Sequence, residues 1–132
     1  EVFEARAVNV RVEKSVSVLL EDMQGSILPI AVAHGEGRLV ATEQQIAALN
    51  AESQVILRYV DSLGHPTQHY PLNPNGSPEA ITGLTSKDGR ATVMMPHPER
   101  NFRALQHSWK PEDWAEDGAW LRMFRNARKF IG

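Results

Sequence analysis

The sequence predicts one α/β domain in which strands joined by hairpins form a sheet and helices pack against it. Three patterns carry this prediction. Residues 5 to 12 ("ARAVNVRV") alternate as a half-buried strand does, Thr42 is suited to be the N-cap of a short amphipathic helix over residues 43 to 53, and the tail repeats its apolar residues at helical spacing. With 132 residues and 42% apolar content, the chain can bury an ordinary core.

Two extended segments flank the sequence "HGEG". Residues 27 to 33 ("ILPIAVA") form a continuous apolar run, which predicts a strand covered on both faces. The glycines of "HGEG" then mark a turn, and residues 38 to 41 ("RLVA") predict a short strand. Residues 15 to 26 fit a strand or a short helix, and their periodicity does not decide between the two.

Two hairpins are expected in the second half of the chain. In the first, residues 54 to 61 form a strand that the turn "SLGHP" joins to residues 67 to 70. In the second, residues 80 to 86 and 90 to 95 are joined by "KDG". Between the hairpins, "PLNPNGSPEA" is rich in proline, asparagine and glycine, so we expect an ordered turn or an exposed loop there.

The tail gives the clearest helical pattern, beginning at Ala119. Its apolar positions follow the spacing i, i+3, i+4, i+7, and they are Trp120, Met123, Phe124, Ala127, Phe130 and Ile131. Basic residues crowd its carboxyl end, where the helix dipole favours positive charge. We therefore interpret the arginine cluster as a solvated helix face in preference to a phosphate site.

Composition narrows the classes of function. The formal net charge is −2 and like charges do not form long blocks, so neither nucleic acid nor an anionic membrane is expected as a partner. The longest apolar run is too short to span a bilayer, and a cytoplasmic protein is the simplest interpretation. Because the chain has no cysteine, it can supply neither a disulfide nor a thiol nucleophile. Its first residue is not methionine and falls inside a predicted strand, so we expect a fragment of a larger protein.

The segment "MMPHPER" (residues 94 to 100) ends an apolar run with a histidine and a glutamate two residues apart. Pro98 biases His97 toward an extended conformation, in which side chains at i and i+2 lie on the same side, so the Glu99 carboxylate comes within reach of the imidazole. Such a carboxylate fixes the tautomer and leaves the other ring nitrogen to take a proton from a nucleophile. The spacing alone slightly favours the other interpretation, a turn in which His97 packs and Glu99 caps a helix over residues 99 to 105.

A second His-x-Glu spacing occurs at His34 and Glu36, within "HGEG". Together with His97 and Glu99, these side chains could supply nitrogen and oxygen ligands for a metal-dependent hydrolase. No metal-binding spacing such as HExxH supports this alternative, and the prediction for metal ligands is none.

The remaining histidines are assigned no chemistry. His65 and His69 fall in a turn and the neighbouring strand and are expected at the surface, and His107 stands near Trp109 in a packing role. "NPNGS" is more distinctive, because a turn through Asn75 and Gly76 exposes consecutive backbone groups that can form a concave site for a polar ligand. Composition alone leaves a plain tight turn as the other interpretation.

Three long motifs, in this order, resemble a known family: "PIAVAHGEGR", "YPLNPNGSPEAITGLTSKDGR" and "MMPHPERNFR". They are similar to the last part of phosphoribosylformylglycinamidine synthase (FGAM synthetase) of the large single-chain bacterial type. The tail "SWKPEDWAEDGAWLRMFRNARKFIG" resembles the extreme carboxyl end of that family. The resemblance spans essentially the whole chain.

The resemblance implies the carboxyl-terminal half of a class I, triad-type glutamine amidotransferase domain, with a flavodoxin-like fold, a mixed sheet and a terminal helix. In that family the domain hydrolyses glutamine, and the ammonia passes to an ATP-dependent synthetase region that converts formylglycinamide ribonucleotide to the amidine in purine biosynthesis. The triad histidine and glutamate fall on His97 and Glu99. Asn75, Gly76 and Ser77 are implied to line the glutamine pocket, whereas the resemblance assigns "HGEG" no chemical step.

One departure from the family limits this prediction. The family's nucleophile is a cysteine on a strand-to-helix elbow upstream of these motifs, and the chain has no cysteine. We therefore expect residues 1 to 132 to be inactive alone and to act with the remaining domains of the enzyme, with glutamine as substrate, no cofactor in this segment, and ATP and Mg²⁺ in the synthetase region. An incomplete sheet would have an open edge, which predicts self-association of the isolated chain. A non-enzymatic ligand-binding or docking module is the alternative from a different class.

Overall fold

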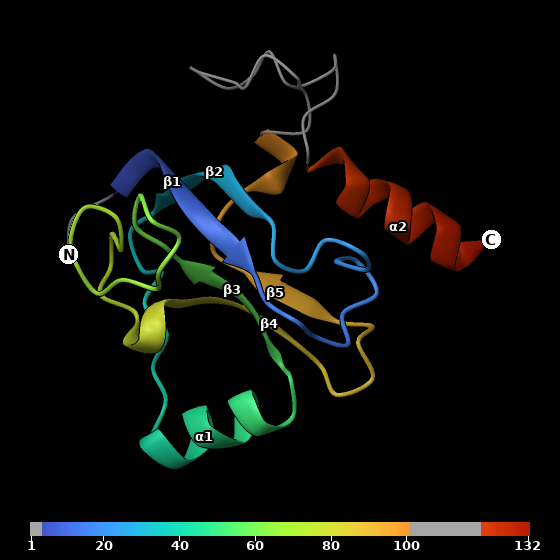
Figure 1. Cartoon of the computed structure of the whole chain (residues 1–132), viewed down its shortest axis with the longest axis horizontal. Coiled ribbons are helices and arrows are strands. Elements are labelled where there is room, and N and C mark those ends of the chain that lie inside the picture. The colour runs from blue at the N-terminus through green and yellow to red at the C-terminus, as the bar shows by residue number, and fades with distance from the viewer. Residues whose placement is uncertain (1–3, 101–119) are drawn as a thin grey trace.

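The structure is a computed structural model that describes residues 4 to 100 and 120 to 132. The strands are β1 (Glu4–Val12), β2 (Ile27–His34), β3 (Val55–Tyr59), β4 (Ile81–Thr85) and β5 (Thr92–Met94), and the longer helices are α1 (Glu43–Ala51) and α2 (Leu121–Ile131). The strands form one sheet in the order β2-β1-β3-β4-β5, and α1 and α2 lie on different sides of it (Figure 1). The α/β class is confirmed.

Every pairing between the described strands is antiparallel. The mixture of strand directions that we expected therefore does not occur in this part of the sheet. The sheet also curls. The chain leaving β5 therefore reaches the opposite edge, where His97 forms an isolated bridge with Ala31 of β2. This bridge brings the "PHPE" motif onto the sheet.

β1 follows the alternation expected from its sequence. Val8, Val10 and Val12 are buried, with exposures of 5%, 0% and 1%, and the residues between them are exposed or half-buried. β1 pairs with β2 over eight residue pairs and with β3 over three. The buried valines join Ile30 and Leu57 in the main core, which places the largest apolar cluster on one face of the sheet.

β2 differs from the expectation that both its faces are covered. Only Ile30 and Val32 are buried along it, while its other residues are half-buried or exposed. The buried Ile30 and Val32 occupy alternate positions, so the described elements bury one face of the strand. A continuous apolar run identified the strand but not the number of faces it buries.

α1 begins as its sequence predicts. The Thr42 hydroxyl accepts from the backbone N–H of Gln45, and the Gln45 side chain accepts from the backbone N–H of Thr42, which completes a capping box. α2 also lies where helical spacing placed it, with Trp120 and Met123 buried. Its predicted first residue, Ala119, lies outside the described residues. In the described ranges, no helix is long and apolar enough to cross a membrane.

Two predicted strands are wrong. Residues 38 to 41 run without strand pairing, and residues 67 to 70 contribute no strand, since only one isolated bridge, between Val60 and Pro66, marks the expected hairpin. Residues 15 to 26 form turns in place of a strand or helix. The second hairpin, β4 with β5, is confirmed, and the left-handed Gly89 closes its turn.

Candidate functional site

His97 and Glu99 form a direct pair beside the outer edge of β2. The Nδ1 atom of His97 lies 2.7 Å from the Oε1 atom of Glu99, a short distance typical of a charge-assisted hydrogen bond. The imidazole is about one third exposed and the carboxylate more than half exposed, at 31% and 57%. The pair is therefore accessible to a reacting partner, and the engaged Nδ1 leaves Nε2 as the nitrogen able to take a proton.

The backbone around His97 fixes this geometry. The N–H of His97 donates to the carbonyl of Ala31 at 2.7 Å, which attaches the motif to β2. Directly afterwards, Pro98 begins the 3₁₀ turn η2 (Pro98–Arg100), and the N–H of Arg100 donates to the carbonyl of His97 at 3.2 Å. Since the chain passes from an extended residue into a tight turn, the two side chains meet across the buried Pro98. Residues 101 to 105 of the helix expected here lie outside the described residues.

The electrostatics of the pair favour an ionised carboxylate. Partial burial acts to raise the pKa of Glu99. The hydrogen bond with His97, a bond to its own backbone amide, and the charges of His97 and Arg100 together outweigh that effect, so the pKa of Glu99 lies below its usual value. A carboxylate that stays ionised beside Nδ1 can hold the imidazole in one orientation and stabilise it when it becomes protonated.

The "NPNGS" loop is ordered by its own side chains. Asn73 is almost fully buried and its amide donates to the carbonyls of Thr67 and Ser77, at 3.0 and 3.1 Å. The Oδ1 atom of Asn75 accepts from the hydroxyl of Ser77 at 2.8 Å, and Gly76 adopts a left-handed φ of 70° between them. The loop is thus a rigid polar turn, as its composition predicts.

One amide of this loop is unused. The Nδ2 atom of Asn75 is buried and has no hydrogen-bond partner in the described ranges. A buried donor without a partner is costly, so it is a natural contact for a polar ligand or for another part of the protein. Ser77 is fully buried and its hydroxyl accepts from the N–H of Leu39 at 3.3 Å, so the serine joins the loop to the segment that follows "HGEG".

His34 of the second His-x-Glu spacing forms no pair with Glu36. Both ring nitrogens of His34 are buried, and neither has a hydrogen-bond partner among the described residues, while Glu36 is exposed. The ring lies against the backbone of Gly37, where an added Cβ would stand 2.7 Å from the ring carbons. Among the residues that the structure describes, no three His, Cys, Asp or Glu side chains gather to hold a metal, so the metal alternative gains no support.

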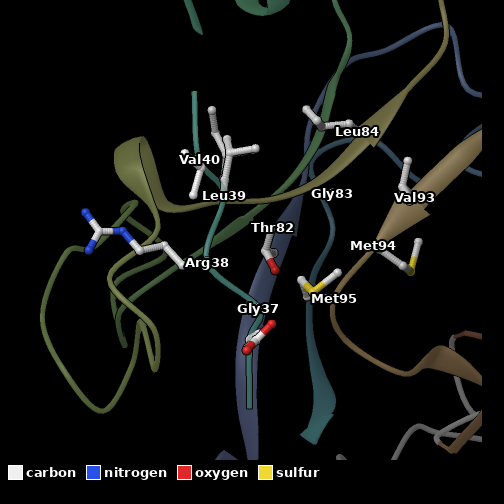
Figure 2. Close-up of a pocket in the computed structure, with 12 residues that line it drawn as sticks. Gly37, Arg38, Leu39, Val40, Thr82, Gly83, Leu84, Val93, Met94 and Met95 are labelled. Carbon is white, nitrogen blue, oxygen red and sulfur yellow. The ribbon is translucent and has the colours of Figure 1, made fainter. Parts of the chain in front are cut away.

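A cavity of about 270 Å³ lies next to the "MMPHPER" motif (Figure 2). Its walls are mostly apolar and come from residues 36 to 40, from β4 and from residues 93 to 95 at the end of β5. Two lining residues are adjacent through a backbone bond, since the N–H of Met95 donates to the carbonyl of Thr82 at 3.1 Å. The Thr82 hydroxyl is buried, close enough to the Tyr59 hydroxyl to act on the pKa of that phenol. No local pattern in the sequence marks this cavity, because its walls come from three distant segments.

The surface positions predicted for two other histidines agree with the structure. His65 and His69 are exposed, as expected for surface residues, and His107 lies outside the described residues. The basic residues of α2 are likewise exposed, in agreement with a solvated helix face. The structure also adds a residue that the sequence did not suggest, Ala31, whose carbonyl holds His97 in place.

The fold and the site define an α/β domain that carries a histidine–carboxylate pair at the edge of a curled sheet. The chain belongs to the CobB/CobQ-like glutamine amidotransferase domain family, whose model matches residues 1 to 131. It is also similar to a solved chain of PurLQS from Thermotoga maritima, with 27% sequence identity and a TM-score of 0.67. The alignment covers 98% of this chain and 49% of that chain, so the present chain spans about half the length of this relative. These similarities confirm the resemblance to the glutaminase part of FGAM synthetase.

Proposed function

We propose that this chain is the part of an FGAM synthetase glutaminase that carries the catalytic base. In the complete enzyme, glutamine is hydrolysed to glutamate and ammonia, and the ammonia passes to the synthetase region, where ATP and Mg²⁺ drive formation of formylglycinamidine ribonucleotide. The observation that carries this proposal is the 2.7 Å contact between Nδ1 of His97 and Oε1 of Glu99, in a chain of the glutamine amidotransferase family. A cytoplasmic location accords with a role in purine biosynthesis.

In this proposal His97 is the general base and Glu99 orients it. His97 takes the proton of a cysteine thiol through Nε2 and later returns a proton to the leaving ammonia, while the lowered pKa of Glu99 keeps the carboxylate charged beside the imidazolium. Because the chain has no cysteine, the thiol comes from outside these residues and the isolated chain releases no glutamate from glutamine. Detectable glutamate release by the purified chain would contradict this.

The "NPNGS" loop is proposed to line the glutamine pocket. Asn75 supports this role because its buried Nδ2 donor has no partner in the described ranges. A Cβ added at Gly76 would meet nothing within 4 Å, so the backbone there is open to a ligand. Ser77 acts on the shape of the loop, since its hydroxyl is already engaged with Asn75 and Leu39.

Substitution of His97 tests the proposal in the complete enzyme. His97→Ala is expected to lower glutamine-dependent synthesis by roughly 10²- to 10⁴-fold, the usual contribution of a positioned base. Synthesis supplied with ammonium salt is expected to be unchanged, because it bypasses the glutaminase. The matched control is His69→Ala, which removes an exposed histidine and leaves both activities intact. Retention of glutamine-dependent activity by His97→Ala would overturn the proposal.

The alternative is a non-enzymatic ligand-binding or docking module, and self-association through an open sheet edge is a separate expectation for the isolated chain. One carbonyl at the outer edge of β2, that of Ala31, already accepts a hydrogen bond from the N–H of His97. This edge is therefore less open than we expect from the sequence. Size-exclusion chromatography with light scattering on the 132-residue chain measures its assembly state. A dimer would accord with an incomplete sheet that pairs through its remaining edge, and a cooperative monomer would count against self-association.

A further inference from the structure

Trp120, directly before α2, is the residue that connects the carboxyl-terminal helix to the sheet. Its side chain is fully buried within the main core cluster. Its indole Nε1–H donates to the carbonyl of Pro29 in β2 at 2.8 Å. A buried indole usually pairs its single donor in this way, so the contact gives the helix a defined position on the strand.

The carbonyl that Trp120 holds faces the outer edge of β2. The carbonyl of Asn9 accepts from the N–H of Val60 at 3.0 Å, so the backbone groups of Asn9 turn toward β3. Asn9 is the partner of Pro29 across the β1–β2 ladder, which makes their pair a non-hydrogen-bonded one. Pro29 has no N–H, so the outward carbonyl is its one backbone hydrogen-bonding group.

The same edge of β2 holds the proposed catalytic histidine. Carbonyls at i and i+2 of a strand point the same way, and the carbonyl of Ala31, two residues from Pro29, accepts from the N–H of His97 at 2.7 Å. Two successive outward carbonyls of β2 therefore hold Trp120 and His97. Only Ile30 separates the two contacts, and its side chain is fully buried, so the short backbone segment between them has little freedom to move.

We propose that Trp120 is a positioning residue for His97. Its hydrogen bond to Pro29 fixes the backbone position of the β2 edge. Because Ala31 of that edge binds the N–H of His97, the same bond fixes the position of the imidazole relative to the substrate. The inference rests on the proposed function of His97 as the base. Small displacements of a catalytic group matter because the reaction requires a near-attack geometry, and a shift of about 1 Å can cost up to roughly 10²-fold in rate.

α2 supplies its own control for this inference. Asn126 is also buried, and its Nδ2 donates to the carbonyls of Leu19 and Glu21, each at 2.9 Å. These bonds anchor the same helix to the turn before β2, and neither reaches the outer edge that holds His97. A variant at Asn126 therefore loosens the helix without removing the bond to Pro29.

The test in the complete enzyme compares Trp120→Phe with Asn126→Ala. Trp120→Phe keeps a buried aromatic ring but lacks the N–H, and it is expected to lower the glutamine-dependent kcat by roughly fivefold to tenfold, with the KM for glutamine and the ammonia-dependent rate unchanged. Asn126→Ala is expected to lower the melting temperature and to leave the kcat intact. Benzothienylalanine at position 120, which keeps the bicyclic shape and loses only the N–H, is expected to reproduce the phenylalanine result and decides the question if Trp120→Phe does not fold.

A second measurement is independent of catalysis. In the 132-residue chain, amide hydrogen exchange at His97 is expected to rise by roughly fivefold in Trp120→Phe, the loss expected when a hydrogen bond is weakened, and to stay unchanged in Asn126→Ala. A Trp120→Phe enzyme with normal kcat and normal His97 exchange overturns this inference but leaves the role of His97 standing. An active His97→Ala enzyme instead overturns the proposed function itself.

Discussion

The chain contains two His-x-Glu spacings, and only one of them forms a pair. His97 and Glu99 meet at 2.7 Å with their side chains partly exposed. His34 buries both ring nitrogens without a partner among the described residues, and Glu36 is exposed. The same spacing thus gives a candidate acid–base site at His97, whereas at His34 the imidazole is packed without a hydrogen bond to a described residue.

The backbone around each histidine explains the difference. His97 is an isolated bridge residue followed by a proline that opens a 3₁₀ turn, and this path returns the Glu99 side chain toward the ring. His34 is the last residue of β2, and its ring turns back onto Gly37, which has no side chain in the way. A spacing therefore limits which residues can meet, whereas the local backbone decides whether they do.

Among the changes that compare the two spacings, the largest effect is expected from removing the charge of Glu99, the carboxylate that we propose orients His97. Glu99→Gln keeps the shape but can present an N–H to the ring, so the imidazole loses its fixed tautomer. In the complete enzyme we expect the glutamine-dependent kcat to fall by roughly 10²-fold or more, with ammonia-dependent synthesis preserved. Glu36→Gln is the matched change at the other spacing and is expected to cost much less. Equal losses in the two variants would remove the distinction between the two spacings.

An intermediate effect, on the free energy of unfolding, is expected from a substitution beside His34. Gly37 lies outside the left-handed region, so Gly37→Ala is allowed by its backbone and acts through the 2.7 Å contact with the His34 ring. Overpacking of this kind lowers the free energy of unfolding by about 1 to 3 kcal/mol. Urea unfolding of the 132-residue chain measures the loss.

A double-mutant cycle identifies the cause of that loss. In a His34→Ala background the new methyl group no longer meets the ring, so Gly37→Ala is expected to become nearly neutral. If the penalty persists when the imidazole is absent, the contact inferred between Gly37 and His34 is wrong.

The smallest effect is the loss of stability at low pH that we expect from the His97–Glu99 pair. Because the pKa of Glu99 is lowered by folding, the folded state binds fewer protons than the unfolded state between that lowered pKa and the ordinary value of 4.5. The free energy of unfolding therefore falls as the pH drops through this window, by less than about 1 kcal/mol since both side chains are partly exposed. NMR titration of the Glu99 carboxyl is expected to show a midpoint below that of a peptide with the same sequence, and His97→Gln is expected to raise it. An identical midpoint in chain and peptide would show that the pair does not form in solution.

Local signals in the sequence predicted several elements correctly. The alternation of β1, the N-cap at Thr42 and the turn before β5 each depend on neighbouring residues, and all three are found. Failures occurred where pairing with a distant segment decides the outcome. Residues 38 to 41 have suitable strand residues but no strand pairing, because the N–H of Leu39 is taken by the Ser77 hydroxyl.

The candidate site was predicted in part for the same reason. His97 and Glu99 are close in sequence and were found together, and the ordered turn at Asn75 to Ser77 followed from its composition. The carbonyl of Ala31, the link from Trp120 and the cavity beside Met95 join segments far apart in the chain. No local pattern in the sequence marks such contacts.

The sequence alone determined the family, through its motifs, and the strand and helix patterns, because both depend on residues that are close in the chain. It also identified the residues of the histidine–carboxylate pair, because His97 and Glu99 are only two residues apart. The folded arrangement decided that β2 lies at an edge and that its outward carbonyls hold both His97 and Trp120. It also decided that His34 is packed, with no partner for its ring nitrogens among the described residues. Backbone groups are the same in nearly every residue, so only the tertiary structure shows which carbonyl faces which donor.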